Sequence, residues 1–269
     1  MNSDQEIAGG DESGSGKDPQ FAYTLARGLE VLQAFSGGEA ALGNREIADR
    51  IGIPRPTVAR LTRTLSMLGY LRYDARSATY RLTPLLLCMA YPVLAQLSVR
   101  QVARPLMQQL ADHAHGAVSI GVRQGMNIVL VESCVDGRAV TGRPDIGATR
   151  PIATTAIGRA YIAAASEAER DEIYALLRAE TKQKWKQLKA QLDTANEFFA
   201  RHGFCIMRDA RPGIHGVGVA LRAGSNGDLL TMNCAVAAFE LRENGLESDI
   251  APRLVQLARN VEMTFGNRT

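Results

Sequence analysis

The chain has 269 residues, of which 46% are hydrophobic and 22% charged, values that are ordinary for a globular protein and exclude a wholly disordered or collagen-like chain. Aromatic residues make up only 6%, which argues against an RNA-binding protein that stacks bases on aromatic side chains. The net charge of +3, taken as one number, indicates no particular partner.

The charge is unevenly distributed along the chain. Residues 1–20 hold five acidic residues and one lysine, a net charge of −4, and we expect them to form a disordered tail. Residues 21–83 hold nine arginines, five acidic residues and no lysine, a net charge of +4. Arginine binds phosphate groups and guanine edges through paired hydrogen bonds, so this block favours a nucleic-acid partner, although a solvated surface would carry the same charge.

The arginine-rich block has the pattern of a helix-turn-helix. A first helix is predicted from Phe21 to Gly37, with an apolar face of Leu25, Leu29, Leu32 and Phe35. Asn44 is predicted to cap a second helix. After a tight turn at residues 52–54, a third helix is predicted to begin near Pro56 and to bury Val58, Leu61, Leu65 and Leu68.

The opposite face of the third helix has the composition of a DNA-reading surface. It presents Arg55, Thr57, Arg60, Arg63 and Thr64, and arginine and threonine contact phosphates, guanine and the thymine methyl group. Two short strands, 70–73 and 79–82, are predicted to follow as a wing, with Arg72 and Arg76 placed to contact the DNA backbone or the minor groove. The alternative is a protein–protein module with an incidental stripe of arginines.

The rest of the chain predicts a linker and a mixed domain. Residues 84–115 are predicted to be helical, and Pro92 and Pro105 are each expected to begin or kink a helix. After Gly116 the hydrophobic period changes to two, and a hairpin is predicted around Gln124 and Gly125. Strands and helices then alternate to the end of the chain, which is typical of an α/β or α+β domain.

A ligand site is predicted where a loop enters a helix. Thr154, Thr155 and Ala156 lie at this helix N-terminus, whose unpaired N–H groups suit a carboxylate, although Thr155 can equally be a plain N-cap. Three further residues lie on or next to predicted strands and are candidates for the same cavity: Cys205, Asp209 and Cys234. The two cysteines have an alternative role as core residues, because free cysteine is usually buried.

Sequence motifs of enzymes are absent from the chain. The nucleophile-elbow, zinc-protease, dinucleotide-binding and P-loop patterns do not occur. The four cysteines include no CxxC pair, and neither they nor the histidines have the spacing of a metal site, so we expect no enzyme activity, cofactor or metal. Neither a signal peptide nor a membrane span is recognisable, so a cytoplasmic protein without a membrane partner is expected.

Three segments together resemble the IclR family of bacterial transcriptional regulators. The first is Leu42-Gly-Asn-Arg-Glu-Ile-Ala-Asp-Arg-Ile-Gly-Ile-Pro-Arg-Pro-Thr-Val-Ala-Arg-Leu61 with Leu68-Gly-Tyr-Leu71. The second, Val99-Arg-Gln-Val-Ala-Arg-Pro-Leu106, is similar to the linker of the family. The third, Pro151-Ile-Ala-Thr-Thr-Ala-Ile-Gly-Arg-Ala160, is similar to its effector-domain motif.

The resemblance implies an α+β protein with four parts. These are a disordered tail (1–20), a winged helix-turn-helix domain (21–83), a linker helix region (84–115) and a GAF-like α/β effector-binding domain (116–269). It implies a homodimer or homotetramer that binds double-stranded operator DNA as an activator or repressor of a catabolic operon. It also implies that a small organic or aromatic acid docks at the start of the third segment's helix.

One stretch departs from the family pattern. Where the family commonly has an acidic pair after a strand, this chain has Arg208-Asp-Ala-Arg-Pro-Gly213, in which only Asp209 is acidic. Two rival hypotheses remain: a DNA-binding regulator that senses nothing, and a small-molecule-binding or enzymatic domain whose helix-turn-helix serves only dimerisation.

Overall fold

The computed structural model describes residues 20–139, 146–224, 227–242 and 244–266. It divides into two compact units, one ending at Tyr91 and one beginning at Pro92, so the boundary falls inside helix α4 (Leu85–Gln96). The expected tail, apart from Gln20, lies outside the described residues. The four-part division expected from the sequence is finer than these two units and stays a prediction.

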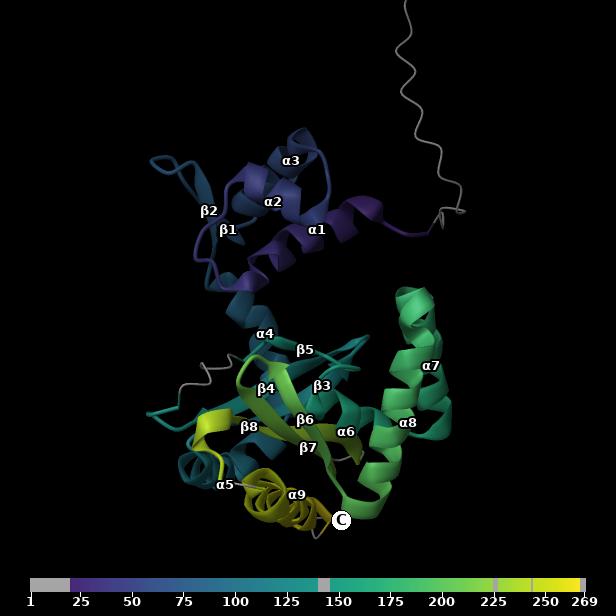
Figure 1. Cartoon of the computed structure of the whole chain (residues 1–269). Coiled ribbons are helices and arrows are strands. Elements are labelled where there is room, and N and C mark those ends of the chain that lie inside the picture. The colour runs from purple at the N-terminus through teal and green to yellow at the C-terminus, as the bar shows by residue number, and fades with distance from the viewer. Residues whose placement is uncertain (1–19, 140–145, 225–226, 243, 267–269) are drawn as a thin grey trace, which may run out of the picture. The chain divides into compact units, whose positions relative to one another are not determined.

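The first unit is a three-helix module followed by a two-stranded hairpin (Figure 1). Its elements are α1 (Tyr23–Gln33), η1 (Ala34–Gly37), α2 (Asn44–Ile51), α3 (Arg55–Met67), β1 (Leu71–Asp74) and β2 (Thr79–Leu82). They share one core that includes Val31, Phe35, Ile47, Val58 and Leu71. Tyr80 of β2 exchanges backbone hydrogen bonds with Leu42, at 2.8 and 3.0 Å, which ties the hairpin to the chain before α2.

Parts of the predicted helical pattern in this unit are wrong. Leu68 was expected on the buried face of α3 but is 60% exposed, and Leu25 and Leu29 on the apolar face of α1 are 65% and 50% exposed. Asn44 is the first residue of α2 and not its cap. Gly43 precedes the helix, and its N–H donates to the Glu46 carboxylate at 2.7 Å.

The second unit is built on a six-stranded sheet with the order β5-β4-β3-β8-β7-β6, in which every neighbouring pair is antiparallel. The strands are β3 (Ala117–Gln124), β4 (Asn127–Val135), β5 (Thr149–Pro151), β6 (Cys205–Arg211), β7 (Ile214–Ala223) and β8 (Asp228–Ala237). The predicted hairpin around Gln124 and Gly125 is confirmed as β3 and β4.

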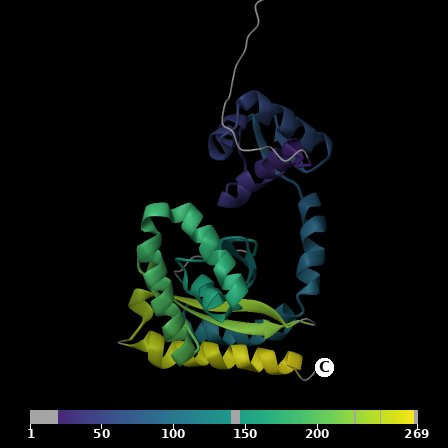
Figure 2. The same cartoon turned by 90° about the vertical axis from the view of Figure 1, so that its right-hand side faces the viewer.

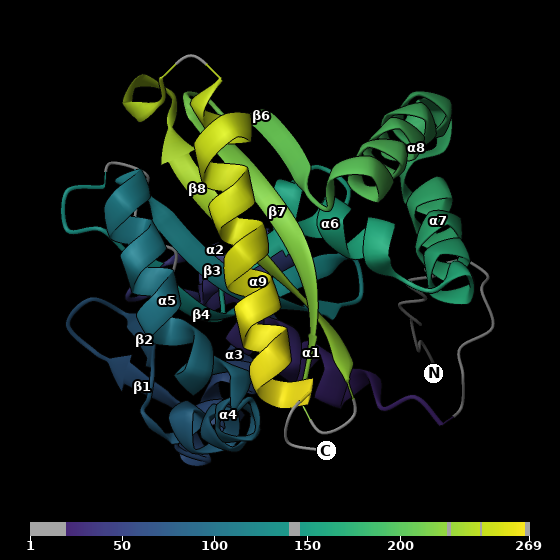
Figure 3. The ribbon, with the colours of Figure 1, turned by 90° about the horizontal axis from the view of Figure 1, so that it is seen from below.

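Helices cover both faces of this sheet. On one face α5 (Val99–Ala114) and α9 (Ala251–Gly266) pack side by side (Figure 3). On the other, α6 (Ala156–Ala164) lies on the sheet, and α7 (Glu167–Thr181) and α8 (Trp185–His202) pack against it (Figure 2). Three short helical turns complete the unit: η2 (Lys182–Lys184), η3 (Ala238–Glu240) and η4 (Leu246–Ile250). The sheet therefore separates two hydrophobic cores.

The break in the predicted linker helix falls between the two prolines. Pro92 lies inside α4 and Pro105 inside α5, so neither begins a helix. The chain turns at Leu97 and Ser98, where the axes of α4 and α5 differ by 84°. Within the described residues no single helix is both long enough and apolar enough to cross a membrane, and α4 with α5 would satisfy that test only as a bent pair.

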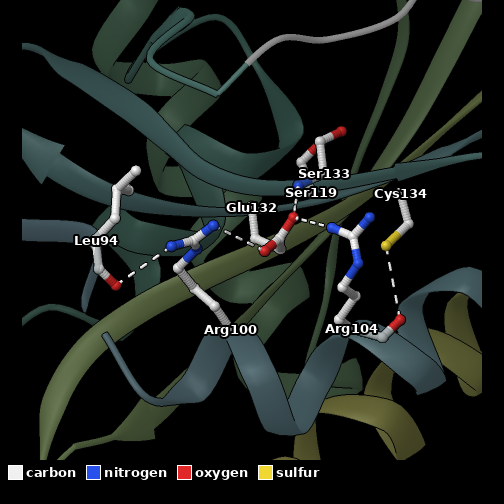
Figure 4. A network of polar contacts seen from close by, with 7 residues as sticks. All are labelled: Leu94, Arg100, Arg104, Ser119, Glu132, Ser133 and Cys134. Atoms are coloured by element: carbon white, nitrogen blue, oxygen red, sulfur yellow. Dashed lines mark hydrogen bonds and ion pairs between the residues drawn. The ribbon is translucent and has the colours of Figure 1, made fainter. Parts of the chain in front are cut away.

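A β-bulge in β4 turns one carboxylate toward α5. Leu130 pairs with Gly121 and Glu132 with the adjacent Ile120, so Val131 is the extra residue. Glu132 consequently lies on the α5 face of the sheet, where its side chain is only 4% exposed. Arg104 and Arg100 of α5 contact its carboxylate at 2.6 and 3.2 Å (Figure 4).

Candidate functional site

The exposed face of α3 carries the residues that the sequence predicts for DNA contact. Its packed side holds Val58 and Thr62, fully buried, with Leu61 and Leu65 partly buried. The side chains on the opposite face are all exposed: Arg55, Thr57, Arg60, Arg63 and Thr64. An exposed arginine and threonine surface on the second helix of a helix-turn-helix is the arrangement that enters the major groove.

A buried hydroxyl helps to fix the angle between α2 and α3. The Thr62 Oγ1 lies 2.9 Å from the Asn44 Oδ1 at the start of α2 and 3.0 Å from the Val58 carbonyl oxygen. Gly52, with φ of +66°, ends α2 in the left-handed region, and α3 begins three residues later at Arg55. The turn and the hydroxyl contact together hold α3 against α2.

The arginines of the first unit fall into two groups, those paired with a carboxylate and those that are not. Those on α1 and α2 are paired with carboxylates: Arg27 with Glu30, Arg45 with Asp49, and Arg50 with Glu39. The Arg50 hydrogen bond is the main cause that lowers the pKa of Glu39 to about 2. Within residues 20–91, the arginines on α3 and the hairpin form no ion pair: Arg55, Arg60, Arg63, Arg72, Arg76 and Arg81. Arginines without an ion pair are therefore concentrated on α3 and the hairpin, although the charge of Arg81 contributes to the lowered pKa of Asp74.

The hairpin has the geometry of a wing. Arg72 of β1 lies directly opposite Arg81 of β2, and Tyr73 lies opposite Tyr80 with ring centroids 4.9 Å apart. In the connecting turn the Arg76 N–H donates to the Asp74 carboxylate at 2.9 Å, which is the main cause that lowers the pKa of Asp74. Arg81 was not among the residues predicted for DNA contact, although the two-residue period of the predicted hairpin could have paired it with Arg72.

A cavity of about 280 Å³ lies at the start of α6 in the second unit. Its lining residues come from β5, the loop before α6, the first turn of α6, and strands β6, β7 and β8: Thr149, Arg150, Pro151, Thr154, Thr155, Ala156, Ile157, Met207, Ile214, His215, Gly216, Asn233 and Ala235. We call it the effector cavity, after the ligand that the sequence predicts at this loop.

The helix N-terminus at this cavity is held close to the sheet. Thr155 is the N-cap of α6, and its hydroxyl accepts a hydrogen bond from the Gly158 N–H at 3.2 Å. A Cβ on Gly218 would lie 2.1 Å from the Ala156 carbonyl oxygen, so only glycine lets α6 approach β7 this closely. The backbone of α6 thereby reaches the edge of the cavity.

The structure brings together half of the predicted ligand-site residues. Thr154, Thr155 and Ala156 line the effector cavity. Cys234 is fully buried in the core on the α5 and α9 face, and its neighbour Asn233 lines the cavity instead. Cys205 and Asp209 are also not among the lining residues.

The cysteines at these positions are buried thiols. Burial raises the pKa of Cys205 and of Cys234 to about 12. Asp209 is exposed, lies in the left-handed region with φ of +54°, and its N–H donates to His215 Nδ1 at 3.1 Å. Among the described residues, no three His, Cys, Asp or Glu side chains are grouped so that they could hold a metal ion.

Several lining residues were not predicted from the sequence. Met207, Ile214 and Ile157 give the cavity an apolar wall, and Gly216 opens it toward α6. Side chains alternate along a strand, so only one of Asn233 and Cys234 can face the cavity, but alternation does not show which neighbouring strands meet there. That requires the strand order β8-β7-β6.

The first unit has the fold of a winged helix-turn-helix, which binds DNA, and the second is an α+β domain with a cavity of small-molecule size. Together they define the class of bacterial transcriptional regulators. Residues 24–75 match the family model of the IclR helix-turn-helix domain, and residues 91–263 match that of the bacterial transcriptional regulator IclR C-terminal domain. The chain belongs to the IclR family. It is a DNA-binding regulator of transcription, not an enzyme.

Individual relatives agree with this assignment. The HTH-type transcriptional regulator TsaQ1/TsaQ2 of Comamonas testosteroni is 28% identical over 254 residues, which cover 93% of this chain and 90% of that protein. The crystal structure of an IclR family transcriptional regulator from Brucella abortus is 40% identical, with a TM-score of 0.76 over 92% of this chain and 94% of that one. An IclR homologue from Microbacterium hydrocarbonoxydans, crystallised with 4-hydroxybenzoate, shares the fold at 19% identity, with a TM-score of 0.68 over 91% of this chain and 99% of that one.

Proposed function

We propose that this chain binds a two-fold repeated operator through the exposed face of α3 and the wing. The observation that carries the proposal is the distribution of ion pairs among the arginines of the first unit. The arginines on α1 and α2 are paired with carboxylates, whereas those on α3 and the hairpin form no ion pair within the described residues. Phosphate groups of DNA would compensate the second set. The residues assigned to this contact are Arg55, Thr57, Arg60, Arg63, Thr64, Arg72 and Arg76, with Arg81 added by its place opposite Arg72.

The effector cavity is assigned to a small organic acid, with an aromatic acid as the favoured class. Within the described residues, the N–H groups of Ala156 and Ile157 at the start of α6 have no hydrogen-bond acceptor, and a carboxylate suits such groups. The apolar wall of Ile157, Met207 and Ile214 fits a ring beside that carboxylate. The Microbacterium homologue was crystallised with an acid of this class, 4-hydroxybenzoate.

The chain is proposed to act in the cytoplasm as a homodimer or homotetramer. Apolar side chains are exposed along α1 and α4, among them Leu25 at 65%, Leu87 at 68% and Tyr91 at 70%. No residue of α4 is buried although the helix is mostly apolar, and such a surface fits a second copy of the chain. Sedimentation of the purified protein tests this, since a monomer at micromolar concentration would contradict it.

A thermal-shift series tests the effector assignment. Addition of 4-hydroxybenzoate and related acids to the purified protein should raise its melting temperature, because a ligand that binds only the folded state stabilises it. The matched control is 4-hydroxybenzamide, which keeps the ring but lacks the carboxylate. The Thr154→Val variant should show a smaller shift. Equal shifts with acid and amide, or none with any acid in the series, would contradict the assignment.

The effector is expected to change operator affinity through the linker region of residues 84–115. A ligand can shift this equilibrium only by its differential affinity for the two states. An acid that stabilises the protein yet leaves operator affinity unchanged would favour a sensory domain that is not coupled to DNA.

A further inference from the structure

Arg100 of α5 contacts both the sheet of the second unit and the last turn of α4. Its Nη2 lies 3.2 Å from the Glu132 Oε2, and its Nη1 donates to the Leu94 carbonyl oxygen at 3.3 Å (Figure 4). Glu132 belongs to β4 and Leu94 to α4, the helix that spans the boundary between the two units. One guanidinium therefore joins the sheet to the linker helix, and we call these two contacts the Arg100 bridge.

The Arg100 bridge leaves one donor unsatisfied. The Arg100 Nε is buried and has no hydrogen-bond acceptor in the described part of the chain. The contact with the Leu94 carbonyl oxygen, at 3.3 Å, is long for a hydrogen bond of this kind. A buried donor without an acceptor costs free energy, so the penalty narrows the gap between this arrangement and one in which the guanidinium releases Leu94.

A row of directly paired residues crosses the sheet from the effector cavity to Glu132. Asn233 of β8 lines the cavity, and its cross-strand partner on β3 is Ser119. Ser119 is buried, and its Oγ lies 3.1 Å from the Oγ of Ser133, its partner on β4. The Ser133 N–H donates to the Glu132 Oε1 at 3.1 Å. Side chains directly opposite each other on one face of a sheet interact, so the row connects the cavity wall to the Glu132 carboxylate.

We propose that Arg100 is the positioning residue through which a ligand in the effector cavity acts on the linker helix. The proposal rests on the effector assignment made above. The ligand displaces Asn233 and the row behind it, the Glu132 carboxylate shifts against Arg100, and the guanidinium releases Leu94. Because α4 spans the boundary between the two units, a change at its last turn is carried toward the DNA-binding unit.

Arg104 provides the matched control because it shares the carboxylate but not the helix. Its Nη1 donates to the Glu132 Oε1 at 2.6 Å, and within the described residues its side chain forms no hydrogen bond or ion pair with α4. If the two ion pairs only stabilise the domain, loss of either arginine lowers the melting temperature and leaves the response to the effector intact. If Arg100 transmits the signal, only its loss removes the response.

Hydrogen exchange of α4 in the full-length protein, followed by mass spectrometry, tests the proposal without DNA. In the unaltered protein and in Arg104→Gln, 4-hydroxybenzoate should speed the exchange of residues 93–98 by about fivefold or more. Arg100→Gln should exchange fast at these residues without ligand and show no further change, although the acid still raises its melting temperature. Equal exchange in the ligand-free Arg100→Gln and Arg104→Gln proteins would overturn the proposal. This comparison decides the role of Arg100 even if no acid stabilises the unaltered protein, an outcome that would contradict only the effector assignment.

Operator affinity measured with and without 4-hydroxybenzoate gives the coupling itself. The ratio of the two affinities should differ from one in the unaltered protein and in Arg104→Gln, and it should fall to about one in Arg100→Gln. Arg100→Lys keeps the charge beside Glu132 but replaces the forked guanidinium by a single nitrogen, so it should lower the ratio with a smaller loss of stability. Coupling between two sites is reciprocal, so operator DNA should change the affinity for the acid by the same factor in each protein. A lower melting temperature with an unchanged ratio in both Arg100 variants would overturn the proposal.

Discussion

Arg72 of β1 and Arg81 of β2 face each other as direct cross-strand partners in the wing. Both side chains are exposed, and neither forms an ion pair with a carboxylate in the described part of the chain. Like charges at directly opposed positions destabilise a hairpin. A phosphate group bound between them would offset this repulsion, so the opposed arginines fit the proposed contact of the wing with DNA.

Substitution of one arginine of this pair should change the thermal stability of the protein and its affinity for DNA in opposite directions. We expect Arg81→Thr to raise the thermal stability of the protein slightly, because it removes the repulsion and threonine favours strands. The same variant should bind operator DNA more weakly and reduce the slope of log K against log salt concentration by about one. Scanning calorimetry and binding at several salt concentrations measure the two effects. A variant that is less stable and binds with an unchanged slope would contradict this role.

Arg60 lies on the exposed face of α3 and is proposed to contact DNA directly. Loss of a paired arginine contact with a base is worth about 1–3 kcal/mol, so Arg60→Ala should bind the operator roughly 5–150-fold more weakly. The control is Arg27→Ala on α1, whose guanidinium contacts Glu30 at 2.7 Å. A mobility-shift titration compares them, and equal affinities for the two variants would disprove the assignment of α3.

The contact between Thr62 and Asn44 is predicted to stabilise the helix-turn-helix. Thr62→Val keeps the shape of a fully buried side chain but removes its hydroxyl, so the free energy of unfolding should fall by about 1–3 kcal/mol. Asn44→Ala should have a smaller effect because Asn44 is partly exposed. Urea unfolding of both variants and of the double variant measures their coupling. Strictly additive losses would mean that the two side chains do not interact.

Glu132 is predicted to hold α5 on the sheet. Glu132→Ala leaves Arg100, whose side chain is 21% exposed, without its carboxylate, and loss of one partner of a buried pair lowers stability by about 3–5 kcal/mol. Arg104 is 57% exposed and contributes less because water screens it. The triple variant Glu132→Leu/Arg100→Met/Arg104→Met should recover most of the loss, since an apolar cluster of similar volume replaces the ions. A triple variant as unstable as Glu132→Ala would contradict this account.

The helix-turn-helix could be predicted from the sequence because its signals are local. Spacing of apolar residues, the glycine at position 52 and the exposed arginines all lie within 25 residues of one another. The predicted burial of Leu68 was wrong because periodicity shows which face of a helix is apolar and not what covers it. Asn44 was wrongly placed as a cap because its side chain contacts Thr62, eighteen residues further along the chain.

The position of Glu132 and the lining of the effector cavity depend on contacts that the sequence does not display. The bulge at Val131 places Glu132 on the α5 face, and no periodic pattern marks a single extra residue in a strand. Thr154, Thr155 and Ala156 could be found because a loop that enters a helix is a local feature. Asn233 and Met207 meet in the effector cavity only because β8, β7 and β6 are neighbours, and Cys205 is buried elsewhere.

The central claim, that α3 and the wing bind operator DNA, is tested most directly by sequencing genomic fragments that the purified protein retains. The unaltered protein should enrich a small set of fragments that share a two-fold repeated sequence. The double variant Arg60→Ala/Arg63→Ala, matched in concentration and shown by calorimetry to be folded, should enrich none of them. Enrichment of the same fragments to the same depth by the double variant would contradict the account.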